Sequence, residues 1–318
     1  MTIVPRAVSR SGALRHEALF YHGHDDYRAG LYAFIAGGVT RAEPVLVVVP
    51  RPRIDLLRDE IDTVSDGEVE VRFLDMGIAG RNPSWIIPGI LHAFVAEHPA
   101  TRVRIVVEPI WPERRALAYP RCVQHEALVN LALADQPASI LCPYDAVGLD
   151  ADVIADAAST HPVLIRAGVR QSSAGYGSPE AVVDAFNLPL PEPALTPSTL
   201  LFDRAGMAGM RALVTALATE AGLASDRVAD LRLATNEIAT NAVVHGGEPA
   251  VLRVWAEPSG MVSEVIGTSV LTDRLAGRLP ASPTSEQGRG LLLVNHLCDL
   301  VDVHTTDEST TVRLHMDW

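Results

Sequence analysis

The chain has 318 residues, with 26 basic residues against 39 acidic ones and a formal net charge of −13 at pH 7. A nucleic-acid-binding protein needs concentrated basic side chains to displace counterions from phosphates, so this acidic balance argues against nucleic acid as a partner. Arginine supplies all 26 basic residues, and the absence of lysine excludes a Walker A lysine, a Schiff-base enzyme and the β3 lysine of ordinary protein kinases.

The hydrophobic content of 48% is ordinary for a globular protein, and the length suffices for two domains with separate cores. No apolar stretch reaches the length of a membrane span, and residues 1–13 lack the apolar core of a signal peptide. We therefore expect a cytoplasmic protein without a membrane partner. The three cysteines form no C-x-x-C pair, and Cys142 and Cys298 each follow a leucine, so buried, inert thiols are expected.

Short apolar runs alternate with helical patterns over the first part of the chain. Strands are predicted at residues 18–21, 45–49, 69–74, 103–107, 139–142 and 163–167. Helices are predicted between them at residues 26–37, 54–61, 84–97, 120–134 and 151–159. This alternation predicts an α/β domain with a doubly wound parallel sheet. No Gly-x-x-x-x-Gly-Lys follows the first strand, so the domain is expected to lack a P-loop.

Four prolines within residues 186–199 exclude a helix or a central strand there and indicate a stiff linker. We therefore divide the chain into a first domain (1–186), a linker (187–199) and a second domain (200–318). The second domain is predicted to contain helices at 205–222, 226–245 and 290–299 and strands at 251–256, 262–266, 301–304 and 311–315. This order suits a two-layer α+β sandwich with helices on one face of a mixed sheet.

Three polar residues, Glu237, Asn241 and His245, recur every four positions along the helix predicted at 226–245, which places them in one row. A carboxylate and a carboxamide one turn apart can orient a water molecule and donate an oxygen to a hard cation. From these residues alone, a polar helix edge that is simply solvated is an equal alternative. The segment resembles the N-box helix of the GHKL (Bergerat) ATP-binding fold, which histidine kinases, gyrase, Hsp90 and anti-sigma-factor serine kinases share.

A second motif opens the helix that follows, and its residues are Gly288, Arg289, Gly290 and Leu291. Glycines at a helix start let backbone N–H groups approach a phosphate, which the helix dipole also favours. The motif is similar to the G2 box of the GHKL fold, and residues 290–301 resemble actinobacterial anti-sigma kinases with a HATPase domain. The resemblance implies that these residues and His245 bind nucleotide. It also implies that Asn241 ligates Mg²⁺ and that Glu237 is the candidate catalytic base.

One position departs from the GHKL pattern. The family carries an aspartate after the second strand that accepts a hydrogen bond from the adenine amino group, and Gly267 stands there in this chain. Loss of a charge-assisted hydrogen bond is worth about 1.5–3 kcal/mol, or roughly tenfold to a hundredfold in affinity. We therefore expect binding of Mg·ATP or Mg·ADP to be weakened, and the sequence leaves open whether the protein is an enzyme.

Several polar clusters of the first domain follow predicted strands, at the edge where open α/β sheets bind ligands. The candidate residues for a sensory pocket are His22, Asp25, Tyr27, Glu108, Trp111, His125, Glu126, Tyr144 and Asp145. With the Gly-Arg-Asn-Pro segment at 80–83 and residues 16–20, these motifs resemble the MEDS sensory domain of methanogen and methylotroph regulators, which implies a RecA/KaiC-like fold. Because no spaced ligand set accompanies His22 and His24, we expect no metal in this domain.

These observations favour a cytoplasmic transcription regulator of the anti-sigma type. In this hypothesis a sensory domain binds a small-molecule signal and controls a degenerate GHKL domain that binds a sigma factor or its antagonist. Residues 200–230 contain no histidine, which argues against a histidine kinase. The first alternative is an active Mg·ATP-dependent protein serine kinase, and the second is a ligand-independent interaction scaffold. The sequence also allows a homodimer.

Overall fold

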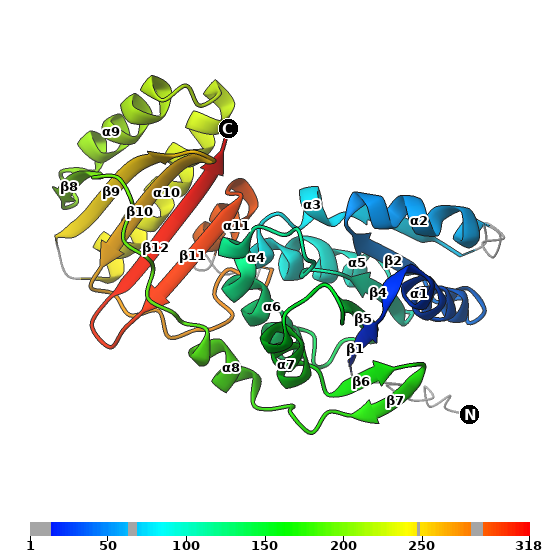
Figure 1. Ribbon diagram of the computed structural model, residues 1–318. Coiled ribbons are helices and arrows are strands. Elements are labelled where there is room, and N and C mark those ends of the chain that lie inside the picture. The colour runs from blue at the N-terminus through cyan, green and yellow to red at the C-terminus, as the bar shows by residue number, and fades with distance from the viewer. Residues whose placement is uncertain (1–13, 63–68, 247–248, 281–288) are drawn as a thin grey trace, which may run out of the picture.

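A computed structural model of the chain describes residues 14–62, 69–246, 249–280 and 289–318. It contains a seven-stranded sheet and a five-stranded sheet, each with its own helices and core (Figure 1). Within these described ranges, no helix has the length and apolar character that crossing a membrane requires.

The first sheet has the strand order β3-β2-β4-β5-β1-β6-β7, and all of its pairs are parallel except β6–β7. Its strands are β1 (Arg15–Tyr21), β2 (Val45–Val49), β3 (Val71–Asp75), β4 (Val103–Val107), β5 (Ala138–Asp145), β6 (Val163–Arg166) and β7 (Val169–Ser172). The prediction of a mostly parallel α/β sheet is confirmed. Every residue of β2 is buried, as its unbroken run of apolar side chains predicts.

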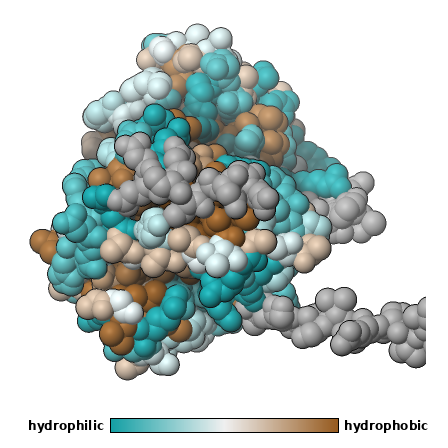
Figure 2. All heavy atoms as spheres, turned by 90° about the vertical axis from the view of Figure 1, so that its right-hand side faces the viewer, coloured by the Kyte–Doolittle hydropathy of each residue, from teal (hydrophilic) through white to brown (hydrophobic). Residues whose placement is uncertain are grey.

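Helices cover both faces of this sheet. They are α1 (Gly23–Val39), α2 (Arg51–Asp62), α3 (Met76–Ala79), α4 (Pro83–Trp85), α5 (His92–Glu97), α6 (Tyr119–Ala132), α7 (Ala151–Thr160) and α8 (Pro179–Ala185). Helices α1 and α2 share one apolar core, and α4 to α7 share the other with the opposite strand faces. On the side of the molecule shown in Figure 2, hydrophilic and hydrophobic residues are interspersed.

The predicted continuous helix at 84–97 is wrong in one respect. A π-helical turn (Ile86–Leu91) separates α4 from α5. Pro88 lies in this turn and has no backbone N–H to donate to the carbonyl four residues earlier, so a regular α-helix cannot continue through it.

The second sheet has the order β11-β12-β10-β9-β8, and every neighbouring pair is antiparallel. The predicted mixed sheet is therefore wrong, because β12 lies between β10 and β11, which run in the same direction, and separates them. The strands are β8 (Ser198–Phe202), β9 (Ala250–Glu257), β10 (Gly260–Gly267), β11 (Leu300–Thr305) and β12 (Thr310–Asp317). The helices α9 (Met207–Glu220), α10 (Ser225–His245) and α11 (Arg289–Leu297) lie on one face (Figure 1).

Residues 186–197 contain no helix or strand, and this proline-rich segment joins the two domains. It is nevertheless fixed to the second sheet, through Glu192, which pairs with Arg253 of β9 at 2.6 Å, and through Asn187. Asn187 Nδ2 donates to the backbone oxygen of Thr305 at 2.7 Å, and its Oδ1 accepts from the Thr305 backbone N–H at 3.0 Å.

Candidate functional site

The helix α10 and the start of α11 bring part of the predicted nucleotide site together. Glu237 is half-buried, and Asn241 and His245 are exposed along α10. A Cβ atom built on Gly290 would lie 2.9 Å from Glu237 Oε2 and 3.8 Å from Asn241 Nδ2, so the first turn of α11 lies directly against both side chains. Arg289 and Gly290 begin this turn, whereas Gly288 falls outside the described residues.

The position of the expected adenine-binding aspartate is closely packed. Gly267 ends β10, where it pairs with Thr310 of β12. A Cβ atom at Gly267 would lie 2.7 Å from the Cβ of Ala242 and 3.2 Å from its Cα. Contacts below about 3.0 Å require a shift of the neighbouring atoms, and here the neighbour is the Cβ of Ala242, which cannot move without the backbone of α10. This arrangement leaves no room for an aspartate unless α10 or β10 moves.

The described part of the loop after β10 contacts α11 through Gly277. Asn295 Nδ2 donates to the backbone oxygen of Gly277 at 2.9 Å, and Leu291 packs against the same glycine. The exposed carboxylate of Asp273 accepts a hydrogen bond from the backbone N–H of Leu275 within the loop. Asp273 therefore caps its own turn instead of replacing the missing adenine contact.

One predicted sensory cluster forms at the carboxyl ends of β1 and β4. The Tyr27 hydroxyl donates to Glu108 Oε2 at 3.0 Å, and Arg53 donates to the Tyr21 hydroxyl at 3.1 Å. Burial raises the pKa of Glu108 to about 8, although Arg53 and the two tyrosines oppose the shift. The second carboxylate oxygen of Glu108 has no hydrogen-bond partner among the described residues. This site lies next to β2 and β4, whose connections leave in opposite directions, which is where doubly wound sheets bind ligands.

A second cluster lies on the other face of the sheet, beneath α6. The Tyr144 hydroxyl donates to Glu126 Oε1 at 2.9 Å. The other oxygen of Glu126 is 3.2 Å from His16 Nε2 and 3.5 Å from His161 Nε2. Burial opposes ionisation of Glu126, but the two histidines hold its pKa well below the usual range. Sequence reasoning missed His16, Cys142 and His161, because these residues come from separate segments that only the tertiary fold brings together.

The remaining predicted sensory residues make no side-chain hydrogen bond to these two clusters within the part of the chain that the structure describes, although the charge of Asp145 acts on Glu108. His22 and Asp25 are exposed at the start of α1, and Trp111 is partly buried with Arg114 over its ring. His125 is fully buried, and neither ring nitrogen has a hydrogen-bond partner within the described parts of the chain. Burial lowers the pKa of His125 to about 3, so the ring is neutral. Asp145, at the end of β5, accepts hydrogen bonds from the backbone of the following turn.

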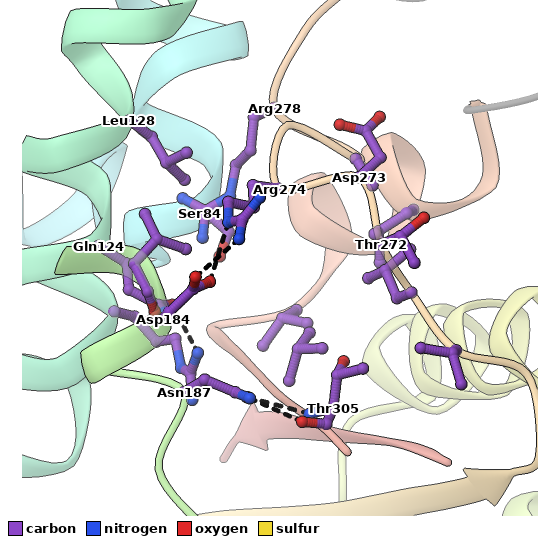
Figure 3. A pocket seen from close by; sticks show the side chains of 18 of the residues that line it. Ser84, Gln124, Leu128, Asp184, Asn187, Thr272, Asp273, Arg274, Arg278 and Thr305 are labelled. Atoms are coloured by element: carbon purple, nitrogen blue, oxygen red, sulfur yellow. Dashed lines mark hydrogen bonds and ion pairs between the residues drawn. The ribbon is translucent and has the colours of Figure 1, made fainter. Parts of the chain in front are cut away.

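A cavity of about 390 Å³ lies between the two domains (Figure 3). On one side of it, Arg274 pairs with Asp184 at 2.7 Å. Arg278 is buried in its wall and donates to the backbone oxygen of Pro83 at 3.3 Å. Burial lowers the pKa of Arg278 to about 9, and the positive charge of Arg121 adds to this shift. Both domains therefore supply polar side chains to one partly open cavity.

The fold and the site define a two-domain signalling protein with an α/β domain and a GHKL-like domain. The family profile described as the MEthanogen/methylotroph, DcmR Sensory domain (MEDS) matches residues 15–162, and that of the histidine kinase-like ATPase domain matches residues 202–316. The chain belongs to the proteins that fuse a MEDS domain to a GHKL-type domain. No curated protein matches the chain. The two domains make it a regulatory, kinase-like signalling protein.

Proposed function

We propose that this protein is a cytoplasmic regulator in which the MEDS domain controls the affinity of the GHKL domain for a sigma factor or its antagonist. One observation carries the proposal. Helix α11 contacts the candidate nucleotide residues at its start and the MEDS domain at its end, so it connects the candidate nucleotide site with the MEDS domain. Figure 1 shows α4 and α11 side by side between the domains.

The contact between α4 and α11 is specific and partly buried. Asn82 caps α4 with its Oδ1 and donates from Nδ2 to the backbone oxygen of Asn295 at 2.9 Å. The rings of Trp85 and His296 lie 4.5 Å apart between centroids. Arg81 Nε lies 2.7 Å from Asp299 Oδ1, directly after α11. Any shift of α4 therefore changes the contacts that hold α11.

The MEDS domain has a route from its interior to this contact. Helix α4 packs against α6, and α6 carries Glu126 of the buried cluster as well as Arg121 of the interface. A signal that binds near Glu126 or Glu108 would change the position of α6 or α4. In this mechanism α11 then moves relative to Glu237 and Asn241, and the affinity for the protein partner changes because the two states bind it differently.

Gly267 separates the binding-only regulator from the serine kinase alternative, in which Asn241 holds Mg²⁺ and Glu237 is the base. Calorimetric titration with Mg·ATP tests the two. We expect weak binding by the wild-type chain, since adenine lacks its carboxylate partner. We expect at least roughly tenfold tighter binding in a Gly267→Asp/Ala242→Gly variant, because the second change makes room for the restored carboxylate.

Two further variants complete this titration. Added to the double variant, Asn241→Ala should abolish the gain in affinity for Mg·ATP. Thr240→Ala changes an exposed neighbour of Asn241 on α10 and should leave that affinity unchanged. If the wild-type chain binds Mg·ATP tightly and Asn241→Ala removes this binding, the result would contradict the binding-only regulator and support the kinase. Pairwise binding measurements with the sigma factors and antagonists of the native cell test the protein partner, and absence of any complex would contradict the proposed regulator. A thermal-shift screen in which neither domain binds a ligand would favour the scaffold.

A further inference from the structure

Four metal-binding side chains converge inside the MEDS domain. They are His16 of β1, Glu126 of α6, Cys142 of β5 and His161, which directly follows α7. One donor atom of each lies within 4.8 Å of the donor atoms of the other three. All four residues are at most 3% exposed. Solvent therefore contributes little to the stabilisation of charge at this point.

Hydrogen bonds around the cluster turn the basic nitrogen of each histidine inward. The Nδ1 atom of His16 lies 3.1 Å from Asn130 Oδ1, and that of His161 lies 2.8 Å from the backbone oxygen of Ala157. Both of these partners are acceptors, since the Asn130 amide nitrogen itself donates to backbone oxygens. Each Nδ1 therefore carries a proton, and the Nε2 atom of each ring faces Glu126, where an unprotonated Nε2 directs its lone pair at the carboxylate.

This arrangement is electrostatically unfavourable without a cation. With both rings neutral, two nitrogen lone pairs and a carboxylate oxygen face one another at 3.2 and 3.5 Å. A proton on one Nε2 would pair that ring with Glu126 but leave the lone pair of the other ring facing the carboxylate. Protonating both rings would bring two positive charges together, because the two ring centroids are only 4.1 Å apart in a dry interior. The Nε2 atom of His161 also makes no hydrogen bond within the described residues. A bound cation would satisfy all of these atoms together.

The distances fit a tetrahedral site. A zinc ion with bonds of about 2.0–2.3 Å separates its ligand atoms by roughly 3.3–3.7 Å. Cys142 Sγ lies 3.4 Å from His16 Nε2 and 3.5 Å from Glu126 Oε2, so these pairs and the two histidine–glutamate pairs are close to that spacing. Imidazole and thiolate ligands select zinc-like ions over Mg²⁺ or Ca²⁺. We propose that His16, Glu126, Cys142 and His161 bind one zinc-class divalent ion.

The surroundings support a closed site. Asn130, the Ala157 carbonyl and the Tyr144 hydroxyl hold three of the four ligands in place, as the outer partners of metal ligands commonly do. Four protein ligands leave no open coordination position, which is typical of a structural or sensing ion and not of a catalytic one. When the ion binds, the Cys142 thiol releases its proton to solvent. The proposal replaces the expectation from the sequence of a metal-free domain and does not depend on nucleotide binding by the GHKL domain.

Cobalt(II) titration of the untagged full-length chain, after dialysis against a chelator, tests this site. We expect one equivalent of cobalt per chain, with a thiolate-to-metal charge-transfer band and the intense visible bands of four-coordinate cobalt. Zinc should displace the cobalt and remove both signals. Asn130→Ala keeps the four ligands but removes a supporting hydrogen bond, so it should weaken metal binding by about 10–100-fold.

Two cysteine variants provide a matched pair. Cys142→Ser should lose the charge-transfer band, whereas Cys122→Ser, which changes an equally buried thiol on α6, should retain it. Because the wild-type spectrum is decisive by itself, the test does not depend on the folding of a variant. A wild-type chain that binds no cobalt, or a charge-transfer band that survives Cys142→Ser, would overturn the proposal. Neither result depends on the Mg·ATP titration.

Discussion

Replacing Arg121 with methionine is expected to lower the free energy of unfolding by about 3 kcal/mol. Arg121 Nε donates to Asp302 Oδ1 at 2.9 Å, and this ion pair joins α6 to β11 across the domain interface. Both side chains are almost fully buried, so methionine would leave the carboxylate of Asp302 without its main partner in a poorly solvated place. Equilibrium unfolding of the full chain in urea measures the change.

Replacing Asp302, the other member of the ion pair, should lower the free energy of unfolding further. Asp302→Leu leaves Arg121 beside the buried guanidinium of Arg278, so two positive charges lose their compensating anion, at a cost of about 3–5 kcal/mol. Arg121→Met removes that repulsion, and Asp302 keeps His315 at 3.3 Å. The double variant Arg121→Met/Asp302→Leu should be more stable than either single variant, because it leaves neither the Asp302 carboxylate nor the Arg121 guanidinium buried without its partner.

Arg115→Met is the matched control for this interface. Arg115 also pairs with an aspartate of the other domain, Asp317, at 3.2 Å, but about a third of its side chain and half of that of Asp317 are exposed. Solvent screens such a pair, and its loss should cost less than about 1 kcal/mol. Equal losses in the Arg115 and Arg121 variants, or a double variant less stable than both single variants, would show that burial does not decide the effect.

The sequence predicted the elements whose residues are close together in the chain. The row on α10 follows from a spacing of four residues, and α10 indeed carries Glu237, Asn241 and His245 along one helix. The strands β2 and β4 were predicted with their bounds, because a short run that is apolar throughout, as in β2, or at all positions but Arg104, as in β4, has few alternatives. The MEDS and GHKL-type resemblances both rested on several motifs in order, and both are confirmed.

Features that depend on distant segments could not be predicted. The cluster of His16, Glu126, Cys142 and His161 requires the register of β1 against β5 and the packing of α6 over both, which no local pattern specifies. The contact of α4 with α11 likewise depends on the orientation of the two domains. The motif at residues 80–83 was noted in the sequence as part of the MEDS resemblance, but its contact with the other domain became visible only in the structure.

The stability of the wild-type chain is expected to fall as the pH rises from about 4.5 to about 8, because of Glu108. Its pKa is about 8 in the folded protein against 4.5 for an ordinary glutamate. Between these values the unfolded chain releases the proton while the folded chain retains it, so unfolding becomes more favourable with rising pH. At about 1.36 kcal/mol per pKa unit, the full effect is on the order of 5 kcal/mol.

Glu108→Gln should remove this dependence. A glutamine keeps an oxygen for the Tyr27 hydroxyl and cannot ionise beside Asp145, although its amide group has no evident acceptor in the described structure. We therefore expect the variant to be more stable than wild type at pH 8 and not at pH 4.5, measured by urea unfolding across this range. Glu113→Gln is the control, because it changes an exposed carboxylate a few residues further along the chain. It should leave the dependence of stability on pH as it is in the wild type. Parallel profiles for wild type and Glu108→Gln would mean that Glu108 is already ionised at neutral pH.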